Sequence, residues 1–262
     1  MGEETTWFNF IPGLNNLEKM LGHTLGREEG QGMFFRWQLF QDSAFTMAHV
    51  YGALLVFGFV TFGALTYRRA VAGGGDGAVV PPERFDLRNL FEMFTEAVMS
   101  VAEGVMGRDN ARLYLPLLGT LAIFIFFSNA LALIPGFIPP TSTLKTNAAL
   151  AVSVFFLTHA FGVREHGLAY FKHFLGPIPW LIPLMLPIEL VSHIARPISL
   201  SLRLLGNMAA DHKVASVFFV LVPLLLPVPL LVLGVLVAIV QTLVFTLLTM
   251  VYIQGAVAHE EH

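Results

Sequence analysis

Residues 183–222 read PLMLPIELVSHIARPISLSLRLLGNMAADHKVASVFFVLV, one helical pattern interrupted only by Pro187 and Pro197. A helix of this length would extend about 60 Å at ~1.5 Å per residue. The hydrocarbon core of a bilayer is only ~30 Å thick. The segment therefore either breaks into two spans near 187–197 or lies strongly tilted in the membrane. The first alternative places Glu189, His193 and Arg196 in a loop, and the second places them on a helix face.

The composition of the chain indicates an all-α, polytopic membrane protein. Of its 262 residues, 55% are hydrophobic and only 13% are charged, against roughly 25% charged residues in soluble domains. The net charge of −3 gives no reason to expect nucleic acid as a partner. The absence of cysteine excludes disulfides and thiolate metal sites.

Hydrophobic runs predict about five membrane-embedded helices, since about 20 helical residues cross a bilayer core. They are residues 45–67, 113–134, 146–163, 183–222 and 230–257. Pro223, Pro227 and Pro229 mark a turn, so the last two form a long, tilted hairpin. We expect a single membrane domain over 45–262. Residues 1–44 form an external segment, either a surface-lying amphipathic helix or a partly ordered tail.

Residues 86–107 form a further helix of amphipathic character, with glutamates away from its apolar face. The apolar residues at helical spacing are Leu90, Phe94, Ala97, Val98, Val101 and Val105. Such a helix lies at the membrane interface or docks on the helix bundle.

The distribution of Lys and Arg predicts the orientation, because these residues favour cytoplasmic loops. The loop 68–112 carries Arg68, Arg69, Arg84, Arg88, Arg108 and Arg112, whereas the 135–145 turn carries only Lys145. The loop 164–177 carries Arg164 and Lys172. We therefore expect 68–112, 164–177 and the C-terminus in the cytoplasm, and the N-terminus outside.

Polar residues within 183–222 line up on one helix face about 80° wide at ~100° per residue. They are Glu189, His193, Arg196, Arg203, Asn207 and Asp211, with Ser192 and Ser199 on the edge. A set of buried polar groups that join helices would explain part of this stripe. Arg203 is harder to explain, because arginine stays charged in proteins and a charge inside a membrane is costly. No acid lies within one turn of Arg203 on this helix, so an anion from another subunit would complete the site.

Four segments of the chain resemble subunit a of the F-type ATP synthase. They are PISLSLRLLGNMAADH (197–212), VQTLVFTLLTMVYIQGAVAHEEH (240–262), SNALALIPG (128–136) and TNAALAVSVF (146–155). The similarity covers roughly residues 45–262. The specific motifs are the arginine in S-L-x-L-R-L-x-G-N and the glutamine in the last helix.

The resemblance implies a non-catalytic subunit without a cofactor, in the inner membrane of a bacterium. Its expected partners are a ring of c subunits with a membrane carboxylate facing Arg203, the peripheral-stalk b subunits, F1 indirectly, and the lipid bilayer. It implies two offset proton half-channels that Arg203 separates, coupling proton flow to ring rotation and ATP synthesis. Matched by motif, the proton-translocating residues are Arg203, Glu189, Ser199, Asn207, Gln241, Asn129 and Asn147.

Three more site residues come from this chain's own departures and from its stripe: Asp211, His212 and His193. Relatives pair an acid with a histidine, nine residues after the arginine and seven before the glutamine; here these positions hold His212 and Gly234. We interpret Asp211 as the substitute acid. The outer path then comprises Asp211, His212, Asn207 and Gln241, and the inner path comprises Glu189, His193 and Ser199.

Two alternatives stay open. An intramembrane haem or metal redox protein could use His49, His159, His193 and His212 as ligands. A self-contained ion transporter would conduct ions without a second subunit. Apart from the first alternative, we interpret His49 and His159 as packing residues.

Overall fold

The computed structural model is helical, with no strand among the residues it describes. These are residues 47–72, 86–134, 137–167, 170, 182–221 and 227–258, with isolated positions 11, 14, 17 and 20. The predicted N-terminal surface helix or tail lies outside the described residues.

Six α-helices and two short 3-10 helices make up the described chain. In order they are α2 (Ala48–Val71), α4 (Leu87–Met106), α5 (Arg108–Ala130), η3 (Leu131–Leu133), η4 (Pro140–Ser142), α6 (Leu144–His166), α8 (Ile182–Leu221) and α9 (Pro227–Val257). Four of the described segments are long and apolar enough to cross a membrane: His49–Arg69, Arg108–Leu133, Leu144–His166 and Pro229–Val257. The predicted all-α, polytopic membrane fold is confirmed.

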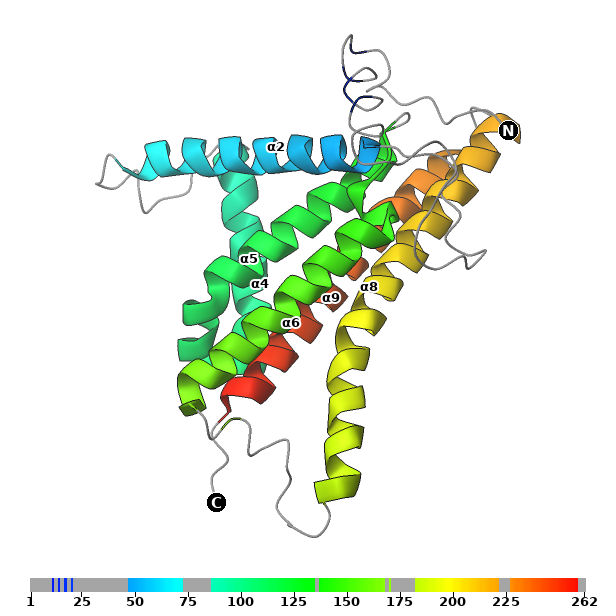
Figure 1. The fold of residues 1–262 in the computed structure, drawn as a ribbon. Coiled ribbons are helices and arrows are strands. Elements are labelled where there is room, and N and C mark those ends of the chain that lie inside the picture. The colour runs from blue at the N-terminus through cyan, green and yellow to red at the C-terminus, as the bar shows by residue number, and fades with distance from the viewer. Residues whose placement is uncertain are drawn as a thin grey trace.

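Helix α8 is unbroken over its 40 residues, although Pro187 and Pro197 lie inside it. Figure 1 shows it as one continuous ribbon that runs beside α6 and α9. Of the two predicted alternatives, the loop near 187–197 is therefore wrong. The predicted turn is also shorter than expected, because α9 already begins at Pro227. Proline is tolerated in the first turn of a helix, where its missing N–H has no intrahelical partner.

Gly107 separates α4 from α5. Its φ of 76° lies in the left-handed region that favours glycine. Helix α5 consequently starts at Arg108, five residues before the predicted span, and its first turn contains the polar residues Asp109 and Asn110.

Helix α4 docks on the bundle, packing against α5 and α9, which agrees with one of the two predicted positions, and its place relative to the membrane interface stays a prediction. Its buried residues are Phe91, Val98, Ala102 and Met106. Only Val98 belongs to the face predicted from apolar spacing. The buried face of α4 is therefore rotated around the helix axis relative to the predicted face. The small side chain of Ala102 allows close approach to the neighbouring helices, whereas Phe94 and Val101 of the predicted face are only partly buried against the same cluster.

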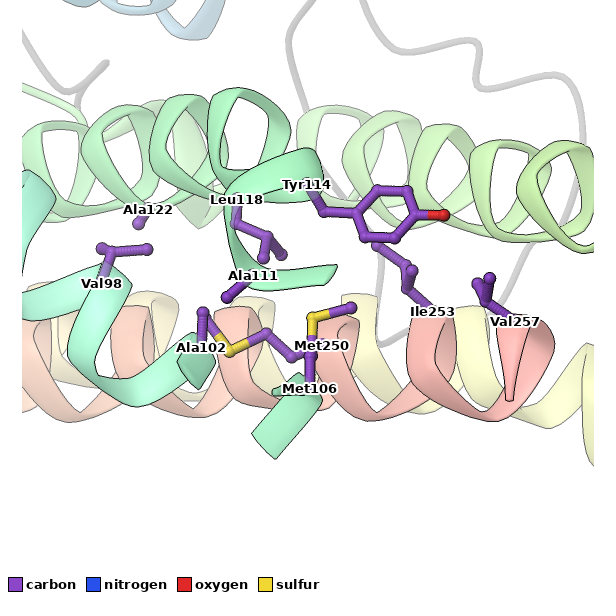
Figure 2. Close-up of a cluster of buried hydrophobic side chains, with 10 residues drawn as sticks. All are labelled: Val98, Ala102, Met106, Ala111, Tyr114, Leu118, Ala122, Met250, Ile253 and Val257. Atoms are coloured by element: carbon purple, nitrogen blue, oxygen red, sulfur yellow. The ribbon is translucent and has the colours of Figure 1, made fainter. Parts of the chain in front are cut away.

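Two cores hold the helices together. Figure 2 shows the first, where α4, α5 and α9 meet through Val98, Ala102, Met106, Ala111, Tyr114, Leu118, Ala122, Met250, Ile253 and Val257. The second joins α5, α6, α8 and α9 through Leu121, Ile125, Ala151, Val154, Leu200, Leu204, Met208 and Phe245. Helix α9 belongs to both cores and thereby fixes α8 relative to the rest of the bundle.

Large apolar side chains remain exposed on α2, α8 and α9. They include Phe57, Phe62, Val191, Ile198, Leu202, Val232, Leu236 and Ile239. Such surfaces are typical of helices that face lipid or another membrane subunit.

Candidate functional site

Arg203 lies on α8 with its side chain exposed. Among the described residues, no carboxylate forms an ion pair with it.

The predicted polar stripe does not coincide with the buried face of α8. Counting ~100° per residue from His193, the buried residues Leu200, Leu204 and Met208 fall between about −20° and +60°. Asn207 and Arg203 fall at about −40° and −80° and are exposed. The stripe thus follows the edge of the buried face rather than its centre, which leaves Arg203 accessible from outside.

Asn207 and Gln241 are in direct contact between α8 and α9. The Asn207 Nδ2 donates a hydrogen bond of 2.7 Å to the Gln241 Oε1. Gln241 is only 3% exposed. The bond fixes the two predicted residues together one helical turn from Arg203.

Glu189 and His193 lie one turn apart and line a cavity of about 340 Å³ between α6, α8 and α9. The His193 Nδ1 lies 2.9 Å from the Glu189 backbone oxygen and 3.4 Å from the Glu189 Oε1. Ser199 is exposed on α8 and is not among the residues that line the cavity. Two of the three predicted inner-path residues are therefore brought together.

Five further polar residues line this cavity, and sequence reasoning did not assign them to a path: Thr158, His159, Tyr170, Arg196 and Tyr252. The Arg196 guanidinium lies 5.1 Å from the centre of the Tyr252 ring, a cation–π distance. Burial raises the pKa of the Tyr170 hydroxyl above its ordinary value, and Glu189 adds to this while Arg196 opposes it. His159 is half-buried at the edge of the buried face of α6, about 100° around the helix from Thr158, and no local signal in the sequence distinguishes it from a packing residue.

Asn129 and Asn147 belong to a separate, buried network around Thr141. The Thr141 Oγ1 donates to the Asn129 Oδ1 at 2.7 Å, and the Asn147 Nδ2 donates to the Thr141 backbone oxygen at 2.7 Å. The Asn129 Nδ2 and the Asn147 Oδ1 have no hydrogen-bond partner among the described residues. The network lies where η4 packs against α8, and Thr141 was not predicted.

The predicted departures near Arg203 are only partly within the described structure. Asp211 and His212 belong to α8, but their side chains lie outside the described residues. Gly234 is buried on α9. The proposed replacement of the missing acid by Asp211 stays a prediction.

One feature of the structure bears on the metal alternative. His159 and His193 have ring centres 5.4 Å apart. In the part of the chain that is described, no three His, Asp or Glu side chains gather as a candidate metal site.

Comparison with known proteins gives consistent matches over most of the chain. A family model described as ATP synthase A chain matches residues 44–254. ATP synthase subunit a 1 of Syntrophotalea carbinolica is 52% identical over 210 residues, which are 80% of this chain and 86% of that protein. ATP synthase subunit a of Geobacter sulfurreducens is 48% identical over 65% of this chain and 74% of its own. The Bdellovibrio bacteriovorus subunit a is 43% identical over 82% of this chain and 95% of its own.

Proposed function

The chain belongs to the ATP synthase A chain family, and we propose that it forms two proton half-channels against a ring of c subunits. Arg203 separates the two half-channels and couples proton flow to rotation of the ring. The exposed guanidinium, with no partner carboxylate among the described residues, carries this proposal. A membrane-embedded carboxylate on each c subunit supplies the missing anion.

The surface of α8 around Arg203 suits close approach of a rotating partner. Ala195, Ser199, Gly206 and Ala210 are exposed and fall within about 60° of one another around the helix. A Cβ added at Gly206 would meet nothing of this chain within 4 Å. Packing within the chain therefore does not require glycine there, and a helix of the ring approaching closely does.

The charge of Arg203 performs two tasks. It favours the ionised form of a carboxylate that stops beside it, so that a proton leaves on one side and another binds on the other. It also repels protons that would pass directly between the half-channels. Each charge that crosses the membrane releases ~2.3 kcal/mol per 100 mV, and this energy drives rotation.

The outer path contains the Asn207–Gln241 bond together with Asp211 and His212. The buried network of Asn129 and Asn147 supports a polar route toward this region, because their unpaired amide atoms can bond to water. The inner path is the cavity beside Glu189 and His193, with Ser199 on the ring side of α8.

The bias of Lys and Arg toward residues 68–112 supports an N-terminus outside and a C-terminus in the cytoplasm. The remaining expected contacts are the b subunits of the peripheral stalk, F1 indirectly, and the lipid of the bacterial inner membrane. The chain itself carries no nucleotide chemistry in this proposal.

The test uses the assembled ATP synthase reconstituted in liposomes, with ATP-driven proton pumping as the readout. Arg203→Ala is expected to abolish pumping while the complex still assembles. Arg108→Ala is the matched control, because its side chain is 72% exposed and lies far from Arg203 in sequence. Normal pumping by Arg203→Ala contradicts the proposal. Ion flux through this chain alone, without the ring, would instead favour a self-contained transporter.

A further inference from the structure

His159 extends from α6 into the cavity that holds Glu189 and His193 of α8. We propose that His159 is a second proton-relaying residue of the inner path, carrying protons between the α8 side of the cavity and the α6 side. This inference rests on the proposed function and adds a residue from another helix to it.

The hydrogen bonds of the two histidines define which nitrogen accepts a proton. The His159 Nδ1 lies 2.8 Å from the Phe155 backbone oxygen, and the His193 Nδ1 lies 2.9 Å from the Glu189 backbone oxygen. A carbonyl oxygen only accepts hydrogen bonds, so each neutral ring carries its hydrogen on Nδ1. The Nε2 of each ring is then the basic nitrogen, and both histidines are prepared for the same role.

The spacing of the rings suits transfer between them. The ring centres of His159 and His193 are 5.4 Å apart and the rings are inclined by 73°. A single water molecule can connect polar groups at such a separation. The proton binds at Nε2 of a neutral ring, the imidazolium keeps its Nδ1–H bond to the carbonyl, and the Nε2 proton leaves to water, so each ring returns to its starting form.

The charged and titratable groups around the two histidines favour transfer of a proton between them over its retention on either ring. Glu189 and Arg196 face the cavity from α8, Tyr252 faces it from α9, and Tyr170 follows α6. Arg196 is a permanent cation beside the pair, and a protonated histidine is a second one. Like charges disfavour one another, so both histidines do not hold a proton together, and a proton arriving on one displaces the proton on the other.

The contacts of His159 also hold its ring in place. Its ring centre lies 4.2 Å from that of Phe155 and 5.9 Å from that of Tyr170. A relay needs such restraint, because proton transfer requires donor and acceptor to stay within hydrogen-bond reach or within one water molecule.

The experiment measures passive proton conduction through the assembled membrane sector, in vesicles stripped of F1. His159→Asn keeps an amide N–H that can donate to the Phe155 carbonyl but has no basic nitrogen. We expect it to reduce conduction by about tenfold, less than the ~10²-fold or more typical of a positioned acid–base group, because water carries part of the flow.

His159→Ala provides a second measurement, because added imidazole can occupy the space that the side chain leaves. Restoration of conduction by imidazole supports a relay, and a purely structural role would not respond to it. The matched control is His49→Asn on α2, a histidine that does not line the cavity. It is expected to conduct like the unchanged complex.

Two outcomes overturn the inference: wild-type conduction in His159→Asn, or a loss in His159→Ala that imidazole does not change. If His159→Asn fails to assemble, the imidazole response of His159→Ala decides alone. Arg203→Ala in the F1-containing liposomes of the first test, where ATP-driven pumping can be measured, keeps the two proposals apart. Pumping by Arg203→Ala contradicts the proposed function, whereas unchanged His159 variants beside a defective Arg203→Ala contradict only the relay.

Discussion

The buried Thr141 network offers a quantitative test of how polar groups stabilise this bundle. Thr141 is fully buried and its Oγ1 donates to the Asn129 Oδ1 at 2.7 Å. Thr141→Val keeps the shape of the side chain but removes the donor. Asn129 is 2% exposed and its Nδ2 already has no partner among the described residues. The substitution therefore removes the hydrogen bond of the Asn129 Oδ1 and leaves both polar atoms of this buried amide without a partner among the described residues.

The expected loss follows from two known ranges. A buried polar group that loses its partner costs about 1–3 kcal/mol. Interhelical hydrogen bonds measured in a membrane bundle average about 0.6 and reach about 1.7 kcal/mol. We expect Thr141→Val to lower the free energy of unfolding by about 1–2 kcal/mol, since Asn129 has no second bond to compensate. This corresponds to a roughly five- to thirtyfold change in the ratio of folded to unfolded chain.

The assay is SDS-induced unfolding of the purified chain in mixed detergent micelles, followed by tryptophan fluorescence. The control is Thr120→Val, whose exposed hydroxyl donates to the Pro116 backbone oxygen at 2.6 Å and should change stability by less than about 0.5 kcal/mol. Equal effects of the two substitutions would refute the reasoning. Proton pumping by the same Thr141→Val complex then tests the role of Asn129: reduced pumping per assembled complex supports the outer path, and unchanged pumping indicates a structural role only.

Three further predictions concern the ring-facing surface and the inner cavity. Gly206→Leu should leave the unfolding free energy of the isolated chain unchanged or raised, because a Cβ there meets nothing of this chain within 4 Å. It should abolish ATP-driven pumping, because its side chain extends toward the ring that we propose beside α8; retained pumping contradicts a close approach there. Gly162→Ala should destabilise the chain by about 1–3 kcal/mol, since its Cβ would overlap the Tyr170 ring, whereas Gly104→Ala meets nothing within 4 Å; equal unfolding free energies would disprove this. The pKa of Tyr170 is raised above 10.0 in the folded chain, so the unfolded chain loses this proton first and stability should fall as the pH rises above about 10; Tyr170→Phe should show a smaller fall in unfolding experiments, and an identical fall contradicts the assignment.

The helices of this chain were predictable because their signals are local. Long apolar runs predicted the spanning helices, and the polar stripe was predicted from helical spacing alone. The length of 183–222 left the choice between a break and a tilt open, because proline inside a helix weakens it without always ending it. Leu200, Leu204 and Met208 belong to the second core, which holds the part of α8 that follows Pro197 against the bundle. Such tertiary packing cannot be read from the local pattern.

The contacts between helices were harder to predict than the helices. Resemblance to a family placed Asn207 and Gln241 in one site, and the 2.7 Å bond brings them together. Thr141 was missed because it lies in a short turn without a helical pattern. Its hydroxyl bonds Asn129 and its backbone oxygen bonds Asn147. His159 was interpreted as a packing residue because only the approach of α8 to α6 reveals the neighbouring His193.

The open space at Gly206 has a consequence for protein engineering. A glycine inside a helix lowers stability by roughly 1 kcal/mol relative to alanine, so a programme that optimises the isolated chain would replace this residue early. The gain in thermal tolerance would come at the surface that we assign to the rotor, and an assay of the single subunit would score the damage as an improvement. Stabilised versions of this chain should therefore be selected in the assembled motor, with turnover rather than melting temperature as the criterion.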